Sequence, residues 1–219
     1  MRGIMICVRE RIEAIAAVLG VPMDTAALDR LMILRGLWLA HGRAINLTGA
    51  GTDEALLHHV GDGLATVACA MRALTEELDD AVRWLDVGSG GGFPALVVAA
   101  STNVRLALVE PRQRRAAFLE FALASIENKS EVIRARLGDA TWCQYALQRG
   151  ISAESSTIML ATSRAVFAPE IWLEIGDKLV MEGGSVVAHL RPEQCGVAGR
   201  EADVVVDWER SRVAGFRRR

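Results

Sequence analysis

The sequence predicts a doubly wound α/β fold, in which helices cover both faces of a mostly parallel β-sheet. From Arg83 onward, short apolar runs alternate with segments of helix length, as in parallel strands joined by helical crossovers. Upstream of Arg83, apolar residues recur instead at helical spacing. We therefore expect an N-terminal helical region, residues 1–80, that packs on an α/β core formed by residues 81–219.

The N-terminal region is predicted to hold three helices. The first, around residues 7–19, ends at Gly20, because glycine readily adopts the left-handed conformation that closes a helix. The turn at residues 22–25 supplies an N-cap for the second, whose apolar side chains form one buried stripe. Thr52, followed by two acids that suit the helix dipole, opens the third.

Six apolar runs of the core are predicted to be strands, and helices are predicted at residues 113–126 and 169–179. The strands are expected at residues 84–87, 104–109, 131–136, 157–161, 185–189 and 203–208. Ligands of such a sheet bind beyond the carboxyl ends of its central strands. The residues that follow each strand are therefore the first candidates for function.

Composition and charge exclude several classes of protein. Hydrophobic residues make up 51% and charged residues 24%, which indicates a globular chain and not a disordered one. The longest apolar run, residues 93–100, is too short to cross a bilayer, and charges at residues 9–11 interrupt any signal-peptide core. We expect a cytoplasmic monomer that binds no membrane. A net charge of −2 argues against a free-standing nucleic-acid binder, although arginines at 112, 114, 115 and 217–219 permit a polyanionic substrate.

The cysteines suggest neither a metal site nor a disulfide framework. They lie far apart, at Cys7, Cys69, Cys143 and Cys195. None forms a C-x-x-C pair, and no histidine lies at a spacing that suggests zinc. We expect four reduced thiols, buried as small hydrophobic side chains, and no bound metal.

A glycine-rich stretch at residues 85–94 follows the first predicted strand. Gly88 and Gly90 allow the backbone to approach a ligand closely. Such a turn alone equally suits the pyrophosphate of a dinucleotide. Asp86, immediately before the glycines, would repel a pyrophosphate, whereas it can accept from the ammonium group of S-adenosylmethionine directly or through water. The stretch therefore favours adenosylmethionine.

Two more acids follow the next two strands. Glu110 lies where a carboxylate accepts from both ribose hydroxyls, and Asp139 lies where it can accept from the adenine amino group. The alternative is that Asp86, Glu110 and Asp139 are helix N-caps, which suits Asp139 better when that residue is considered alone. Three acids after three successive strands favour a cofactor site.

Several stretches in a fixed order resemble the RsmG (GidB) family of bacterial methyltransferases, which modify N7 of a guanine in 16S rRNA. The matching stretches are residues 45–48, His59 with Asp62 and Leu64, 85–90 with 92–94, 116–119, 163–166 with 168–169, and 183–184. The resemblance covers roughly residues 30–190. It implies S-adenosylmethionine as cofactor, a seven-stranded-type class I methyltransferase sheet, and 16S rRNA in the small ribosomal subunit as partner.

The resemblance also implies roles for single residues. Gly88 and Phe93 would line the cofactor pocket, Glu110 would bind the ribose, and Arg164 would reach the cofactor or substrate phosphates. The full cofactor set is Asp86, Gly88, Ser89, Gly90, Phe93, Glu110, Gly138, Asp139 and Arg164. The substrate set is Asn46, His59, Asp62 and Arg164. The alternatives are a surface ion pair for Arg164, helix-terminus partners for His59 and Asp62, and a turn residue for Asn46.

The chain departs from the family's pattern mainly on the substrate side. His58 stands where the family usually has a basic residue. Residues 137–138 interrupt an arginine–alanine–glutamate sequence and displace its acid to Asp139. Leu190 replaces a lysine near the end of the fifth strand, and the closing segment is shorter than usual. These differences put the substrate in doubt more than the cofactor.

The implied transfer needs no general base, because guanine N7 carries an in-plane lone pair. The methyl group must be held in line with N7 and water excluded. Asp62 can accept from the guanine N1 and N2 hydrogens, and His59 or Asn46 can donate to O6. Phe93 can stack on the base or pack on the cofactor. No catalytic side chain is assigned.

Two other functions stay open from the sequence. One is a related methyltransferase that acts on a small molecule or another RNA position. The other is a dinucleotide-binding protein or a non-catalytic protein that binds adenosylmethionine.

Overall fold

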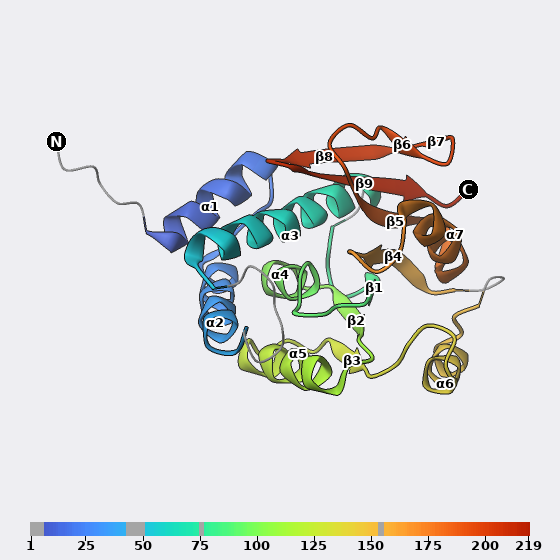
Figure 1. Cartoon of the computed structure of the whole chain (residues 1–219), viewed down its shortest axis with the longest axis horizontal. Coiled ribbons are helices and arrows are strands. Elements are labelled where there is room, and N and C mark those ends of the chain that lie inside the picture. Colours follow the sequence, from blue (N-terminus) through green and yellow to red (C-terminus); the bar gives the residue numbers. More distant parts are fainter. Residues whose placement is uncertain (1–6, 43–50, 75–76, 153–155) are drawn as a thin grey trace.

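A computed structural model of the chain describes residues 7–42, 51–74, 77–152 and 156–219. Its centre is a seven-stranded sheet in the order β3-β2-β1-β4-β5-β9-β8 (Figure 1). The strands are β1 (Arg83–Val87), β2 (Arg105–Val109), β3 (Glu131–Ile133), β4 (Ile158–Ser163), β5 (Val180–Leu190), β8 (Val204–Trp208) and β9 (Ser211–Arg217). The first five strands run parallel, while β9 is antiparallel to both of its neighbours. The predicted fold class is therefore confirmed.

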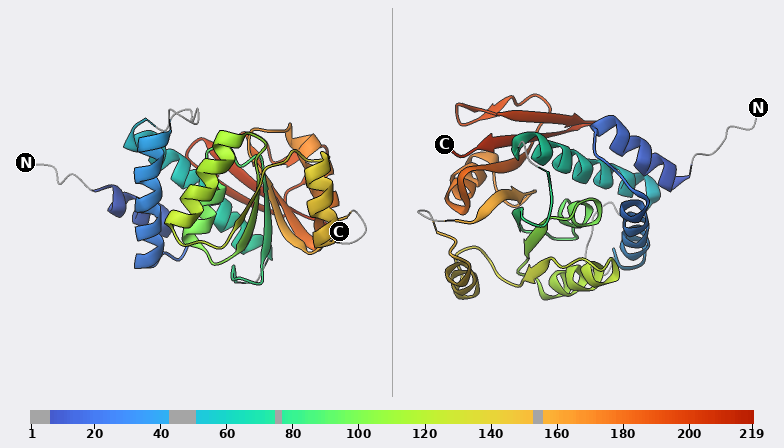
Figure 2. Two further views of the ribbon diagram at one scale, coloured as in Figure 1. Left: turned by 90° about the horizontal axis from the view of Figure 1, so that it is seen from below. Right: turned by 180° about the vertical axis from the view of Figure 1, so that it is seen from behind.

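Helices cover both faces of this sheet. They are α1 (Val8–Leu19), α2 (Thr25–His41), α3 (Asp53–Leu74), α4 (Ala95–Ser101), α5 (Gln113–Ser125), α6 (Ala140–Arg149) and α7 (Pro169–Leu179). Helices α6 and α7 lie on the opposite side of the sheet from α2 and α5 (left view of Figure 2). Strand residues alternate between the two faces. Trp84 belongs to the hydrophobic cluster that includes α1–α5, whereas its neighbour Leu85 belongs to the cluster under α6 and α7.

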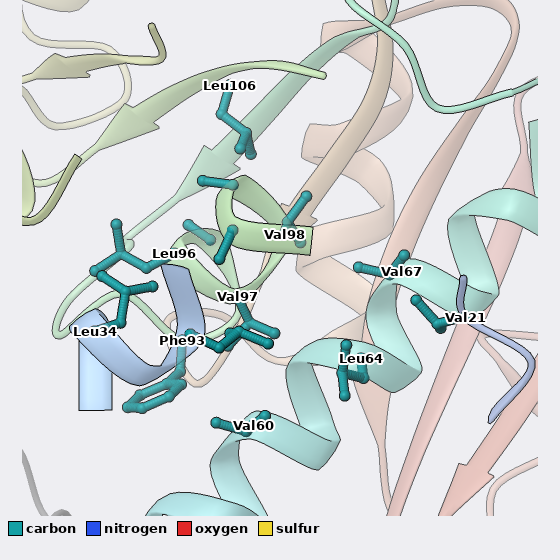
Figure 3. Close-up of a cluster of buried hydrophobic side chains, with 14 of the residues drawn as sticks. Val21, Leu34, Val60, Leu64, Val67, Phe93, Leu96, Val97, Val98 and Leu106 are labelled. Atoms are coloured by element: carbon teal, nitrogen blue, oxygen red, sulfur yellow. The ribbon is translucent and has the colours of Figure 1, made fainter. Parts of the chain in front are cut away.

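Helix α4 is the most deeply buried helix in the part of the chain that the structure describes. Its residues from Ala95 to Ala100 have no exposed surface. Figure 3 shows Leu96, Val97 and Val98 packed among side chains of α2, α3 and β2. The longest apolar run of the sequence is therefore the helix that follows the glycine-rich turn, and it fixes that turn against the core.

The predicted helix boundaries in the N-terminal region are confirmed. Gly20 ends α1 with a φ of 73°. Asp24 caps α2, since its side chain accepts from the backbone N–H of Ala27 at 2.6 Å. At the start of α3, the Thr52 hydroxyl accepts from the N–H of Ala55 at 3.3 Å. Five helices share one hydrophobic cluster with the sheet, and the division of the chain near residue 80 stays a prediction.

Other expectations need correction. Strand β3 ends at Ile133, because the Ala135 N–H donates to the Ile133 carbonyl and turns the chain away from the sheet. Helix α6, strand β9 and the small hairpin of β6 (Gly196–Val197) and β7 (Arg200–Glu201) were not predicted. All four thiols are free, but only Cys69 is buried, so the expectation of burial is wrong for the other three. Across the described ranges, no helix combines the length and apolar character that a membrane span needs.

Candidate functional site

A cavity of about 750 Å³ opens at the carboxyl ends of β1, β2 and β4. Three of the predicted cofactor residues, Gly88, Glu110 and Gly138, line it, and each follows a different strand. Ala165, Val166 and Phe167, which follow β4, close another side. The cavity therefore lies at the sheet edge where the sequence predicts a ligand.

Gly88 forms the narrow part of this cavity. Its φ of 77° lies in the left-handed region, and a Cβ added to it would overlap a methyl group of Val166. Its N–H and that of Ser89 both donate to the Val109 carbonyl, which ties the turn to β2. Only glycine allows this backbone to line the cavity so closely.

Glu110 presents a fixed carboxylate in the wall of the cavity. The side chain is almost fully buried. Its Oε2 accepts from the N–H of Gly90 at 2.9 Å, and its Oε1 accepts from the N–H of Arg112 at 2.8 Å. Each carboxylate oxygen has a second lone pair, so the group can still accept from two hydroxyls of a ligand.

Asp86 lies beneath the glycine turn and is not among the residues that line the cavity. Its Oδ1 accepts from the Thr162 hydroxyl at 2.5 Å, and that hydroxyl oxygen accepts from the Trp84 indole at 3.1 Å. Burial raises the pKa of the Asp86 carboxyl to about 6, against hydrogen bonds from Ser89 and Thr162 that favour the ionised form. In this structure Asp86 joins β1 to β4.

Asp139 caps helix α6. Its Oδ1 accepts from the N–H of Trp142 at 2.8 Å, and its Oδ2 accepts from the N–H of Arg136 at 2.7 Å. These backbone donors hold the pKa of the carboxyl below its usual value. The helix-cap alternative describes this geometry, while the neighbouring Gly138 lines the cavity. Contact of Asp139 with adenine stays a prediction.

Arg164, which follows β4, lies in a polar cluster with two of the predicted substrate residues. Its guanidinium donates to Asp62 Oδ2 at 2.6 Å and lies 3.5 Å from His59 Nδ1. Asp62 is 1% exposed, whereas the Arg164 side chain is 24% exposed. Asn46, the fourth predicted substrate residue, lies outside the described residues. The structure thus brings together the three members that it describes.

Phe93 joins this cluster to the hydrophobic core through an aromatic column. Its ring stacks on Trp38 with centroids 4.3 Å apart, and its other neighbour is His59 at 4.9 Å. Exposure grows from fully buried Trp38, through Phe93 at 8%, to half-buried His59. Phe93 therefore holds the His59 ring in place at the outer end of the column.

Sequence reasoning missed His189, which lies near the end of β5 beside the same cluster. Its Nε2 lies 3.3 Å from the Thr66 hydroxyl, which donates to the Asp62 carbonyl at 2.9 Å. Burial, and then the charge of Arg164, lowers the pKa of His189 to about 4, while the charge of Asp62 opposes this shift. The available signal was a single histidine within the otherwise apolar run 186–190.

His58 also contributes to the cluster. Its Nδ1 lies 2.7 Å from Glu209 Oε2, and its Nε2 lies 3.8 Å from Asp62 Oδ2. Asp62 Oδ1, in contrast, is buried and makes no hydrogen bond to any described residue. The cluster thus concentrates one buried carboxylate, one guanidinium and three imidazoles beside the cavity edge. Nowhere in the described ranges do three or more histidine, cysteine, aspartate or glutamate side chains form a group that could hold a metal ion.

Comparisons with known proteins identify the family of this chain. The family model described as GidB, rRNA small subunit methyltransferase G, matches residues 29–195. A ribosomal RNA small subunit methyltransferase G of Ralstonia nicotianae is 36% identical over 189 residues, which are 84% of this chain and 80% of that protein. A protein of the same name from Chelativorans sp. is 30% identical and covers 80% of each chain.

A solved structure shows the same fold. The 16S rRNA N2 G1207 methyltransferase of T. thermophilus, solved with AdoMet and guanosine, superposes with a TM-score of 0.52. It is 13% identical, over 72% of this chain and 43% of that one, so this likeness concerns the fold alone. The family model spans most of the chain, and the relatives match it over four fifths of its length. The chain therefore belongs to the rRNA small subunit methyltransferase G family.

Proposed function

We propose that this chain transfers the methyl group of S-adenosylmethionine to N7 of a guanine in 16S rRNA of the small ribosomal subunit. It acts in the cytoplasm as a monomer without a metal ion. The observation that carries this proposal is the adjacency of two sites at one sheet edge. The Gly88–Glu110 cavity opens beside β4, and the Arg164 cluster begins at the residue after β4. Family membership supports the same assignment.

The cavity suits adenosylmethionine. The buried Glu110 carboxylate has free lone pairs for the two ribose hydroxyls, and Gly88 gives the ligand access to the backbone. When bound, this cofactor supplies an electrophilic methyl group on a sulfonium. The contacts of Asp86 with the cofactor's ammonium group stay a prediction, because Asp86 lies beneath the turn and already accepts from Thr162.

The polar cluster suits an anionic, planar substrate. Asp62 is buried and holds Arg164, so it acts as a positioning residue, whereas Arg164 is exposed enough to meet an RNA phosphate. His59, at the outer end of the aromatic column, can pack against a base or donate to guanine O6. Asn46 stays a predicted substrate residue.

Methyl transfer with labelled cofactor tests the substrate. Purified small subunits that lack the modification, naked 16S rRNA and a panel of small acceptors are compared, with enzyme that was either untreated or treated with EDTA and dialysed. We expect 7-methylguanosine in digests of the subunit RNA, more label in subunits than in naked RNA, and no effect of this treatment of the enzyme. Label only in a small acceptor would reject this function in favour of a small-molecule methyltransferase.

Calorimetry with adenosylhomocysteine tests the cofactor site. Glu110→Ala removes the ribose acceptor, so we expect the affinity to fall by at least tenfold, as the loss of a hydrogen bond to a charged group implies. Glu120→Ala removes an exposed acid of α5 and serves as the matched control. Equal affinities of these two variants would contradict the assignment of Glu110.

A further inference from the structure

A second cavity, of about 460 Å³, opens at the amino ends of the parallel strands. Arg83 and Arg105, the first residues of β1 and β2, line it together with Lys129 and with Tyr145 and Arg149 of α6. Both strands are five residues long. The opening therefore lies roughly 15 Å from the cofactor cavity, at the opposite edge of the sheet. Nothing in the proposed transfer uses it.

This second cavity is strongly cationic. Of the described residues that line it, four are arginine or lysine and Glu131 is the one acid. Arg83 and Arg105 are register partners on adjacent strands, so two like charges lie side by side. Neighbouring like charges repel each other, and a sheet gains nothing from them unless an anion lies between them.

The surrounding chain neutralises these cations incompletely. Arg83 donates to the carbonyl oxygens of Asp80 and Ala81, which carry no net charge. Within the described ranges, Arg105 has one ion pair, at 3.3 Å, with an Asp80 side chain that is 73% exposed. Such exposed pairs are weak and are readily exchanged for another anion.

The single acid of the cavity already has partners. Glu131 accepts from the Tyr145 hydroxyl at 2.9 Å and from Arg149 at 3.0 Å. The Arg149 guanidinium also lies over the Tyr145 ring, 5.3 Å from its centroid. Glu131 thereby orders the α6 wall. Arg83 and Arg105 face the cavity with no carboxylate among its other described lining residues.

We propose that this cavity, which we call the amino-edge site, binds phosphate groups of the RNA substrate. The proposal rests on the RNA-directed function proposed above. A free nucleotide offers the same phosphate chemistry, but cationic side chains continue beyond one cavity. A neighbouring hollow of about 280 Å³ shares Arg105 and Lys129 and adds Arg30, and it also holds the acids Asp80 and Glu127. A surface that extends over two adjoining hollows suits a polymer better than a mononucleotide.

The amino-edge site gives the protein a second RNA contact that reads no sequence. Phosphate contacts fix the position of a nucleic acid, and base contacts near the cofactor select the target. A chain with a net charge of −2 gains RNA affinity only where cations are concentrated. Simultaneous contact at both sheet edges requires RNA segments that only a folded subunit holds at the right separation.

Binding to purified small subunits, measured over a series of KCl concentrations, tests the amino-edge site. The double variant Arg83→Gln/Arg105→Gln should weaken binding and lower the slope of log K against log salt by about 2, one unit for each lost phosphate contact. Adenosylhomocysteine affinity should stay unchanged. The charge-retaining Arg83→Lys/Arg105→Lys variant should keep the wild-type slope. The matched control, Arg9→Gln/Arg11→Gln, removes the same charge from α1 and should also keep it.

An unchanged slope in the glutamine variant, or an equal loss in the α1 control, would overturn the proposal. If the double variant does not fold, the exposed Lys129→Gln should still lower the slope by about 1. A rise in melting temperature with AMP, in the wild type but not in the variant, at unchanged subunit affinity would identify a free nucleotide as the ligand and also reject the RNA proposal. Binding with the predicted slopes but without methyl transfer would contradict only the proposed function.

Discussion

Arg164 donates to Asp62 across 2.6 Å and thereby joins the end of β4 to the middle of α3. The pair is asymmetric, because the carboxylate is buried and the guanidinium is partly exposed. The carboxylate thus fixes a cation at the sheet edge where the cofactor cavity opens. The effect of substituting Asp62 on methyl transfer should therefore be separable from any effect on cofactor binding in the cavity.

Asp62→Asn should lower methyl transfer to subunits while leaving adenosylhomocysteine affinity unchanged. The amide keeps an oxygen acceptor but removes the charge that orients Arg164. The fold-change in kcat should therefore be larger than the fold-change in the KM for the subunit. A stability loss of about 1–3 kcal/mol is expected for disturbing a buried polar contact. Asp53→Asn, which breaks another arginine pair on the same helix, is the control and should retain activity. Full activity in Asp62→Asn would exclude the positioning role.

Gly88→Ala should abolish adenosylhomocysteine binding and destabilise the fold by more than about 1 kcal/mol. A left-handed φ alone costs an alanine roughly that amount, and the overlap with Val166 adds to it. Gly150→Ala, at a φ of 64° with nothing within 4 Å, carries only the conformational cost and should bind normally. Calorimetry and urea unfolding of both variants separate the two effects. Adding Val166→Ala should recover part of the lost stability, and no recovery would count against the overlap.

Asp86 should make the fold less stable as pH rises. Its pKa of about 6 in the folded chain exceeds the ordinary value near 3.9, so the folded state holds a proton that the unfolded state has lost in this range. Stability should therefore fall between about pH 4 and 6, by about 3 kcal/mol in total. Asp86→Asn should lack this loss, whereas Asp80→Asn, at an exposed acid, should retain it. If the free energy of unfolding, measured with urea, changed with pH equally in the wild type and in Asp86→Asn, the raised pKa of Asp86 would be refuted.

His189 should have the opposite pH dependence. Its pKa of about 4 lies below the ordinary value near 6.5. Between these two pH values the unfolded chain binds a proton that the folded chain does not bind. Its contribution to stability should therefore be lost as pH falls from about 6.5 to 4. His189→Gln keeps an N–H donor for Thr66 and should remove this loss. Because Asp86 acts in the same range with opposite sign, the comparison must be made in the Asp86→Asn background.

The sequence predicts those site residues whose position depends only on their place after a strand. Glu110 follows its strand directly, and parallel strands end at one edge, so its place beside Gly88 was predictable. Asp139 satisfied the same rule, yet its carboxylate caps α6, because a helix begins immediately after it. Local sequence does not distinguish these two outcomes, since both place an acid between a strand and a helix.

The part that did not follow depends on contacts between distant segments. His189 meets Thr66, which lies 123 residues away in the chain, and no spacing rule connects them. Strand β9 was missed for a related reason. Gly215 and the arginines weaken its apolar pattern, while its pairing with β5 and β8 supplies the backbone hydrogen bonds that define it.

The place of β9 has a consequence for how the protein is made. The strand fills the gap between β5 and β8, although it follows both in the chain. Without residues 211–217, β8 has no neighbour in the sheet and β5 presents an open edge. Open edges of apolar strands pair readily with other chains. A chain that stops before β9 is therefore prone to misassociation, because that edge stays permanently uncovered.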